Sequence, residues 1–181
     1  LVGQVVQLGA VQVEVLILQR MGQLVHGGDP EVRRVRRPPH DHLTGLGNRR
    51  LLLKELDDAF QSVKSGAIGY FSLFLMDLDD FKDINDLYGH LAGDHVIKVI
   101  AQRLGECARR PDLSVRLGGD EFAVLIRSDR KPDTDLLARR LLDAITRPVI
   151  WDGIALGVKA SIGIVVADAS SDASSNPIDW L

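Results

Sequence analysis

A glycine pair between two apolar runs constrains the fold of this chain more than any other feature. Gly118 and Gly119 separate the run Leu113–Leu117 from the run Glu121–Ile126. Glycine adopts positive φ without steric cost, and a tight turn between two short apolar runs requires that freedom. The pattern therefore predicts an antiparallel hairpin, and with it a sheet that contains both runs.

The remaining apolar residues follow the periods of helices and strands in turn. Tyr70–Met76 is apolar nearly throughout, as expected of a central strand that is covered on both faces. Periods of about 3.6 residues predict helices over 51–64, 81–87, 93–108 and 134–146, and a further strand is expected over 158–166. Asp79 or Asp80 is expected to cap the helix over 81–87, and Gly89 to end it. This order predicts an α+β fold in which helices flank a mainly antiparallel central sheet.

Composition and length limit the number of domains. The chain has 181 residues, 45% of them apolar, which suits one globular domain with flanking sequence. Residues 1–40 differ from the rest because they are rich in Val, Gln and Arg, with an alternation over 11–17 that predicts a strand. They are either the end of an upstream sensory module with its linker or plain flanking sequence. We therefore place the domain at residues 41–181 and, since the chain begins with Leu, interpret it as a fragment.

Charge and cysteine content narrow the partners and the compartment. The formal net charge of −3 gives no overall attraction to nucleic acid or to an anionic membrane. The basic run Arg33–Arg37 is interpreted as a solvated segment, with nucleic-acid binding as the alternative. The stretch Leu1–Leu18 falls short of the ~20 apolar residues that span a bilayer, so no membrane contact is expected from this segment. The single cysteine, Cys107, excludes an internal disulfide and fits the cytoplasm, whereas the full-length protein could carry a membrane anchor.

Acidic residues stand at the ends of two predicted strands. Asp77 ends the central strand, and Asp120 precedes the strand that leaves the glycine turn, with Glu121 next to it. If these strands are neighbours, the carboxylates converge at one edge of the sheet. Carboxylates so close to a core are costly unless a cation or a hydrogen-bond donor compensates them, and hard divalent cations prefer such oxygen ligands. The alternative is a pair of solvated strand ends.

The segment after the central strand offers places for a phosphate and for a base. A helix that begins there directs the free N–H groups of Asp80, Phe81 and Lys82 outward, which is a general way to bind phosphate. Asn85 and Asp94 suit guanine, because one carboxylate accepts both the N1–H and the N2 amino group of that base. The alternatives are a surface lysine at position 82, a helix end at Asn85 and a helix cap at Asp94.

Four stretches of the chain form a recognisable set. They are the entry segment Asp41–Arg49, the acidic run Asp77–Asp94, the Arg-x-x-Asp pattern of Arg109–Asp112, and Arg116–Phe122 with its Gly-Gly-Asp-Glu-Phe sequence. Together they resemble the GGDEF domain of diguanylate cyclases, which condense two GTP molecules into cyclic di-GMP. The resemblance implies the nucleotide-cyclase-like palm of that family, with a ferredoxin-like sheet.

The resemblance also implies a role for each candidate residue. Asp77 and Asp120 hold Mg²⁺, or Mn²⁺ in its place, through their carboxylates, and Leu78 does so through its carbonyl. Asp120 and Glu121 are the catalytic residues. The remaining implied contacts are a GTP site formed by Asp80, Phe81, Lys82, Asn85, Asp94, Gly118 and Gly119, and an inhibitory product site formed by Arg109 and Asp112. The entry segment is expected to have a structural role.

The partners implied by the resemblance follow from the reaction. Two domains, each with one GTP, face each other in a homodimer, and cyclic di-GMP inhibits the enzyme as its product. The resemblance leaves room for a sensory or phosphodiesterase domain fused to this domain in the whole protein. Family members continue into a final helix with basic residues for the phosphates, and residues 177–181 resemble only its start, so activity of this fragment is an open question. The alternative function is a catalytically inactive module that binds GTP or cyclic di-GMP and regulates a fused partner.

Overall fold

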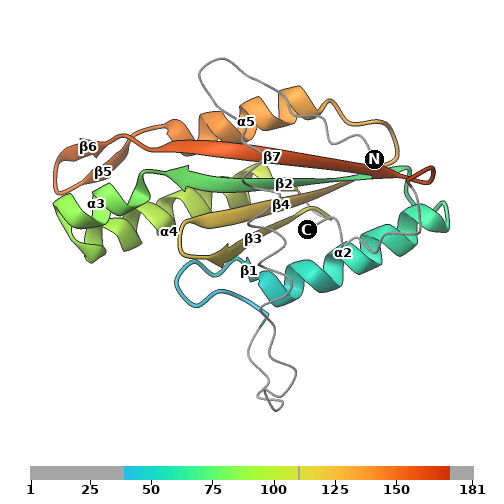
Figure 1. Cartoon of the computed structure of the whole chain (residues 1–181), viewed down its shortest axis with the longest axis horizontal. Coiled ribbons are helices and arrows are strands. Elements are labelled where there is room, and N and C mark those ends of the chain that lie inside the picture. Colours follow the sequence, from blue (N-terminus) through green and yellow to red (C-terminus); the bar gives the residue numbers. More distant parts are fainter. Residues whose placement is uncertain (1–38, 110, 172–181) are drawn as a thin grey trace, which may run out of the picture.

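The computed structural model describes residues 39–109 and 111–171 of the chain (Figure 1). Its elements in chain order are β1 (Gly47–Asn48), α2 (Arg49–Lys64), β2 (Tyr70–Asp79), α3 (Phe81–Tyr88), α4 (His90–Cys107), β3 (Leu113–Gly118), β4 (Glu121–Ser128), α5 (Thr134–Thr146), β5 (Val149–Trp151), β6 (Ile154–Leu156) and β7 (Lys159–Asp168). The strand predicted over 11–17, the basic run Arg33–Arg37 and the helix start at 177–181 lie outside the described residues. No helix within the described ranges is long and apolar enough to cross a membrane.

Five strands form one mixed sheet in the order β1-β3-β4-β2-β7, and β5 and β6 form a separate hairpin. β1 pairs with β3 in parallel, whereas the β3–β4, β4–β2 and β2–β7 pairs are antiparallel. The longest strands, β2 and β7, lie side by side along the molecule in Figure 1. The predicted α+β fold with a mainly antiparallel sheet is therefore confirmed.

Helices cover both faces of this sheet, with α2 on one face and α4 and α5 on the other (Figure 1). The central strand β2 supplies large side chains to both cores, because successive side chains of a strand point to opposite faces. Phe74 lies in one core together with Ile100 of α4, and Phe71 lies in the second core together with Leu56 of α2. The continuous apolar sequence of β2 thus corresponds to a strand that is buried on both faces.

The start of α3 differs from the sequence prediction. Asp80 occupies the N-cap position, but its backbone is left-handed, with φ 56° and ψ 22°, and its side chain makes no capping hydrogen bond. A side-chain cap normally requires extended backbone at this position. Asp79 does not cap the helix either, because β2 extends to this residue and its Oδ1 accepts a hydrogen bond from the Ser161 hydroxyl of β7 at 2.8 Å. The predicted aspartate cap is therefore wrong.

Two other features of the fold are not predicted by the periodicity of apolar residues. α4 begins at His90, three residues before its predicted start, because Gly89 at φ 83° ends α3 and lets the next helix begin at once. The β5–β6 hairpin has strands of three residues each, too short for an alternating pattern to be recognised. It is held against α4 by His95, whose ring lies 5.2 Å from that of Trp151.

Candidate active site

The two acidic strand ends lie side by side. β2 and β4 pair in antiparallel fashion, and Asp77 of β2 stands directly opposite Glu121 of β4. The Leu78 N–H donates to the carbonyl oxygen of Asp120 at 3.3 Å, which holds this turn residue against the end of β2. The side chains of Asp77, Asp120 and Glu121 are half-buried. The structure thus brings together the acidic residues that the sequence singled out.

The glycine pair forms the turn between β3 and β4. Gly118 has φ 149° and Gly119 has φ 54°, both in the region that favours glycine. The register of the two strands shifts between Arg116 and Gly118, so the turn adjoins a β-bulge. A methyl group at either glycine would meet no atom within 4 Å. Backbone conformation therefore requires glycine here, while the open space around the turn lets a ligand approach the main chain.

The donor set at this end of the sheet consists of oxygen atoms. It comprises the carboxylates of Asp77 and Asp120 and the main-chain carbonyl of Leu78. Within residues 39–109 and 111–171, no three His, Cys, Asp or Glu side chains form a group that could hold a metal ion. Mg²⁺ suits a small donor set of this kind, because it keeps water ligands and takes substrate phosphates in place of a closed protein cage. A divalent cation at this place would therefore need water or ligand oxygens besides these three donors.

The left-handed residue Asp80 turns the chain sharply from β2 into α3. Its carbonyl oxygen accepts a hydrogen bond from the Asp83 N–H at 2.9 Å. The N–H groups of Phe81 and Lys82 belong to the first turn of the helix, where no acceptor within the helix exists. The Lys82 side chain is exposed. Both N–H groups therefore lie just beyond the end of β2, close in sequence to Asp77.

Asn85 of α3 packs against α4 at Gly93. A methyl group at Gly93 would collide with Asn85 Oδ1, and it would lie 3.2 Å from Cζ of Phe81. The absence of a side chain at Gly93 therefore makes room for the Asn85 amide. Asp94, the next residue, is exposed on α4. The structure thus brings Asn85 beside the helical turn that carries Asp94.

Arg109 and Asp112 form a compact turn before β3. The Arg109 N–H donates to Asp112 Oδ2 at 3.3 Å, and the Arg127 N–H of β4 donates to Asp112 Oδ1 at 3.2 Å. The Asp112 carboxylate therefore fastens this turn to the sheet, while Arg109 is exposed. This turn and the glycine turn stand at opposite ends of β3.

Residues 39–178 match the family described as the GGDEF domain of diguanylate cyclases. The chain belongs to this family. The glycine turn and the two acidic strand ends are thus those of a GGDEF domain.

Relatives and solved structures agree with this membership. An uncharacterized protein of Mycobacterium tuberculosis is 44% identical over 126 residues, which are 69% of this chain and 20% of that protein. The bifunctional diguanylate cyclase and cyclic di-GMP phosphodiesterase MucR of Pseudomonas aeruginosa is 40% identical over 127 residues, 70% of this chain and 18% of MucR. The chain therefore spans only 18% to 20% of the length of these two relatives.

Two crystal structures from Caulobacter crescentus share the fold. A sensory box/GGDEF family protein has a TM-score of 0.68 and 37% identity, with 71% of this chain and 83% of that chain covered. The GGDEF domain of DgcB, in complex with cyclic di-GMP, has a TM-score of 0.66 and 29% identity, with 75% and 82% covered.

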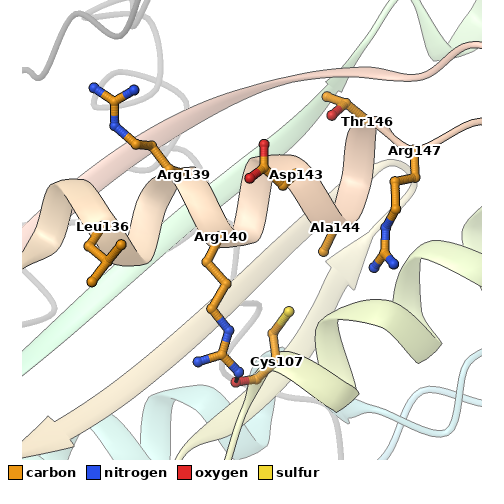
Figure 2. A pocket seen from close by; sticks show the side chains of 8 residues that line it. All are labelled: Cys107, Leu136, Arg139, Arg140, Asp143, Ala144, Thr146 and Arg147. Atoms are coloured by element: carbon orange, nitrogen blue, oxygen red, sulfur yellow. Dashed lines mark hydrogen bonds between the residues drawn. The ribbon is translucent and has the colours of Figure 1, made fainter.

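A groove between α5 and the end of α4 is a feature of this GGDEF domain that sequence reasoning missed (Figure 2). It has a volume of about 900 Å³, and its lining includes Arg139, Arg140 and Arg147. Arg140 Nη2 donates to the Cys107 carbonyl at 2.8 Å, two residues before Arg109. The pair of arginines in α5 is visible in the sequence, but no spacing rule predicts the contact of Arg140 with Cys107, which lies 33 residues earlier.

Proposed function

We propose that the protein is a diguanylate cyclase that condenses two GTP molecules into cyclic di-GMP and releases two pyrophosphates. The observation that carries this proposal is the pairing of Asp77 with Glu121, together with the Leu78–Asp120 hydrogen bond beside it. Membership of the GGDEF family supports the same chemistry. The chain spans only 18% to 20% of the length of the Mycobacterium tuberculosis relative and of MucR. The proposal therefore concerns the full-length protein, in the cytoplasm, where GTP is available.

The acidic end of the sheet would organise the reacting groups. Asp77, Asp120 and the Leu78 carbonyl would hold Mg²⁺, or Mn²⁺ in its place; bound there, the cation would offset charge on the phosphates and lower the pKa of the ribose 3′-hydroxyl. The 3′-oxygen of one GTP forms a bond to the α-phosphorus of the other, and the bond from that phosphorus to the pyrophosphate oxygen breaks. Glu121 takes the hydroxyl proton in this scheme or completes the cation site.

The α3 and α4 segments would hold the rest of the nucleotide. The main-chain N–H groups of Phe81 and Lys82 and the Lys82 ammonium group face the phosphates beyond the end of β2. Asn85 and Asp94 accept and donate hydrogen bonds at the guanine edge, so that ATP leaves these groups unpaired and is rejected. The open space around the glycine turn lets the substrate approach the main chain.

Two further parts of the proposal concern assembly and regulation. One site presents one 3′-hydroxyl and one α-phosphate, so two copies of the domain face each other and exchange these groups in a homodimer. Cyclic di-GMP is proposed to bind at the turn of Arg109 and Asp112, where Arg140 adds positive charge for its phosphates. A fused sensory domain would control whether the dimer forms, and a fused phosphodiesterase domain would degrade the product.

The test is to incubate the full-length protein with GTP and Mg²⁺ and identify the products by chromatography and mass spectrometry. We expect cyclic di-GMP and pyrophosphate, and no cyclic product from ATP. Asp120→Asn should abolish turnover while nucleotide binding and the thermal unfolding midpoint stay near those of the wild type. Binding of GTP without turnover at any protein concentration would refute the enzyme and identify an inactive nucleotide-binding module.

A further inference from the structure

The side chain of Arg116 is tied to the glycine turn. Its Nε and Nη2 atoms both donate to the Gly119 carbonyl oxygen, at 3.0 and 2.8 Å. Its Nη1 atom donates to Asp41 Oδ1 at 3.2 Å. The side chains of Arg116 and Asp41 are only 12% and 15% exposed, so their ion pair is shielded from water. The guanidinium thus links the turn to a residue that lies 75 positions earlier in the chain.

Asp41 is itself fixed by the entry segment. Its Oδ1 also accepts hydrogen bonds from the Thr44 N–H at 3.0 Å and from the Thr44 hydroxyl at 2.7 Å, and the Asp41 N–H donates to the Leu46 carbonyl at 2.8 Å. Burial raises the pKa of the Asp41 carboxyl, but the hydrogen bonds from Thr44 and Arg116 outweigh this effect and lower that pKa overall. Asp41 is therefore an ionised and immobile acceptor for Arg116 at neutral pH.

The turn requires such support because glycine does not fix its own backbone. Gly118 and Gly119 both have positive φ, and a glycine chain has many other conformations of similar energy. Asp120 follows Gly119 directly, so the position of the Gly119 peptide sets the position of the Asp120 backbone. Arg116 holds the Gly119 carbonyl from one side, and the Leu78 N–H holds the Asp120 carbonyl from the other.

We infer that Asp41 and Arg116 form a clamp that holds the glycine turn in the conformation which places Asp120 beside Leu78. Arg116 is a positioning residue for the turn, and Asp41 positions Arg116. The consequence for catalysis rests on the proposed function of Asp120, whereas the consequence for the turn does not. A guanidinium suits this role because its planar fork reaches the carbonyl and the carboxylate together, which a lysine ammonium does not do.

The chain offers a matched control for this clamp. Arg127 of β4 is 13% exposed, and its Nη2 pairs with Glu55 Oε2 at 2.8 Å. It also donates to main-chain carbonyls, those of Pro111 at 2.9 Å and Glu55 at 3.0 Å. Arg127→Gln therefore removes a half-buried arginine with an ion pair and carbonyl contacts, but it leaves the glycine turn untouched.

The first measurement is hydrogen exchange at the Leu78 amide by NMR, with the full-length protein and no nucleotide. This amide donates to Asp120 and is buried, so its exchange reports release of the turn. Arg116→Gln should speed its exchange about tenfold or more, as expected for the loss of charged hydrogen bonds, and Arg127→Gln should not. Asp41→Asn, which keeps an acceptor for Thr44, should act in the same direction and decides the matter if Arg116→Gln does not fold. Equal exchange at Leu78 in these variants and in Arg127→Gln would overturn the clamp.

The second measurement separates the clamp from the proposed function. If the wild type makes cyclic di-GMP, Arg116→Gln should lower kcat about 10²-fold, the cost of misplacing a reacting group by about 1 Å, with little change in KM for GTP. Arg127→Gln should keep the wild-type kcat in initial rates measured before product accumulates. A fall in kcat of equal size in both variants would mean that Arg116 supports the fold in general and does not position the turn. An inactive wild type would refute the proposed function, while the exchange at Leu78 would still decide the clamp.

Discussion

Replacement of Gly93 by alanine tests the packing that orients Asn85, the residue that we propose to contact guanine. The backbone of Gly93 is helical, so alanine itself is compatible with α4 and should gain about 1 kcal/mol in helix propensity. Its methyl group, however, would collide with Asn85 Oδ1 and approach Phe81. Overpacking of a close contact costs about 1–3 kcal/mol, so the free energy of unfolding should be unchanged or fall by up to about 2 kcal/mol.

Gly105 provides the matched control, because it lies in the same helix. A methyl group there would lie 3.7 Å from Cδ2 of Leu46, an ordinary contact, so Gly105→Ala should stabilise the protein by up to about 1 kcal/mol. Urea unfolding should therefore separate the two variants by about 1–3 kcal/mol. Gly93→Ala should also displace Asn85 and narrow the proposed preference for GTP over ATP, measured as the ratio of the dissociation constants of the two nucleotides. If Gly93→Ala is as stable as Gly105→Ala and keeps that preference, the argument is refuted.

Three further predictions concern capping, acid stability and regulation. Arg103 donates to the carbonyls of the last turn of α5 and of Arg147 and Pro148. Arg103→Met should therefore lower the free energy of unfolding, measured in urea, by about 1–2 kcal/mol. An unchanged midpoint of urea unfolding would contradict this capping role. Folding lowers the pKa of Asp41 from its ordinary value of 3.8, so its contribution to stability is present above that value and is lost as the pH falls through the folded pKa. Asp41→Asn should therefore make the free energy of unfolding fall less steeply as the solution is acidified. An equally steep fall in the variant and the wild type would contradict the lowered pKa. Arg109→Ala should raise the concentration of cyclic di-GMP needed for half-inhibition while the uninhibited rate stays the same, and unchanged inhibition would remove this residue from the product site.

The sequence predicted those parts of the site that depend on strand ends. Asp77 and Asp120 could be expected together because a continuous apolar strand and a glycine hairpin each end in carboxylates, and central strands of one sheet end side by side. The Arg116 clamp could not be predicted, because a contact between residues 75 positions apart leaves no periodic signal. The capping of α3 was predicted wrongly for a related reason. The Asp79 carboxylate accepts a hydrogen bond from Ser161 of β7, a strand that is distant in sequence, and does not cap the helix.

The geometry of β3 restricts how the product could inhibit its own synthesis. The Arg109 turn and the glycine turn stand at opposite ends of this strand of six residues, which at about 3.3 Å per residue separates them by roughly 20 Å. A ligand at Arg109 therefore does not reach a nucleotide at Asp120 of the same domain. If cyclic di-GMP binds at the Arg109 turn as we propose, its inhibition would act either along the β3–β4 hairpin or by holding two domains in an unproductive arrangement. The Asp112 carboxylate fastens the Arg109 turn to β4, and β4 begins at Glu121, so the two turns belong to one rigid hairpin. Such a hairpin would pass on little local distortion, so we predict that the proposed inhibition acts through the arrangement of two domains and is noncompetitive with GTP in steady-state kinetics; competitive inhibition would contradict this reasoning.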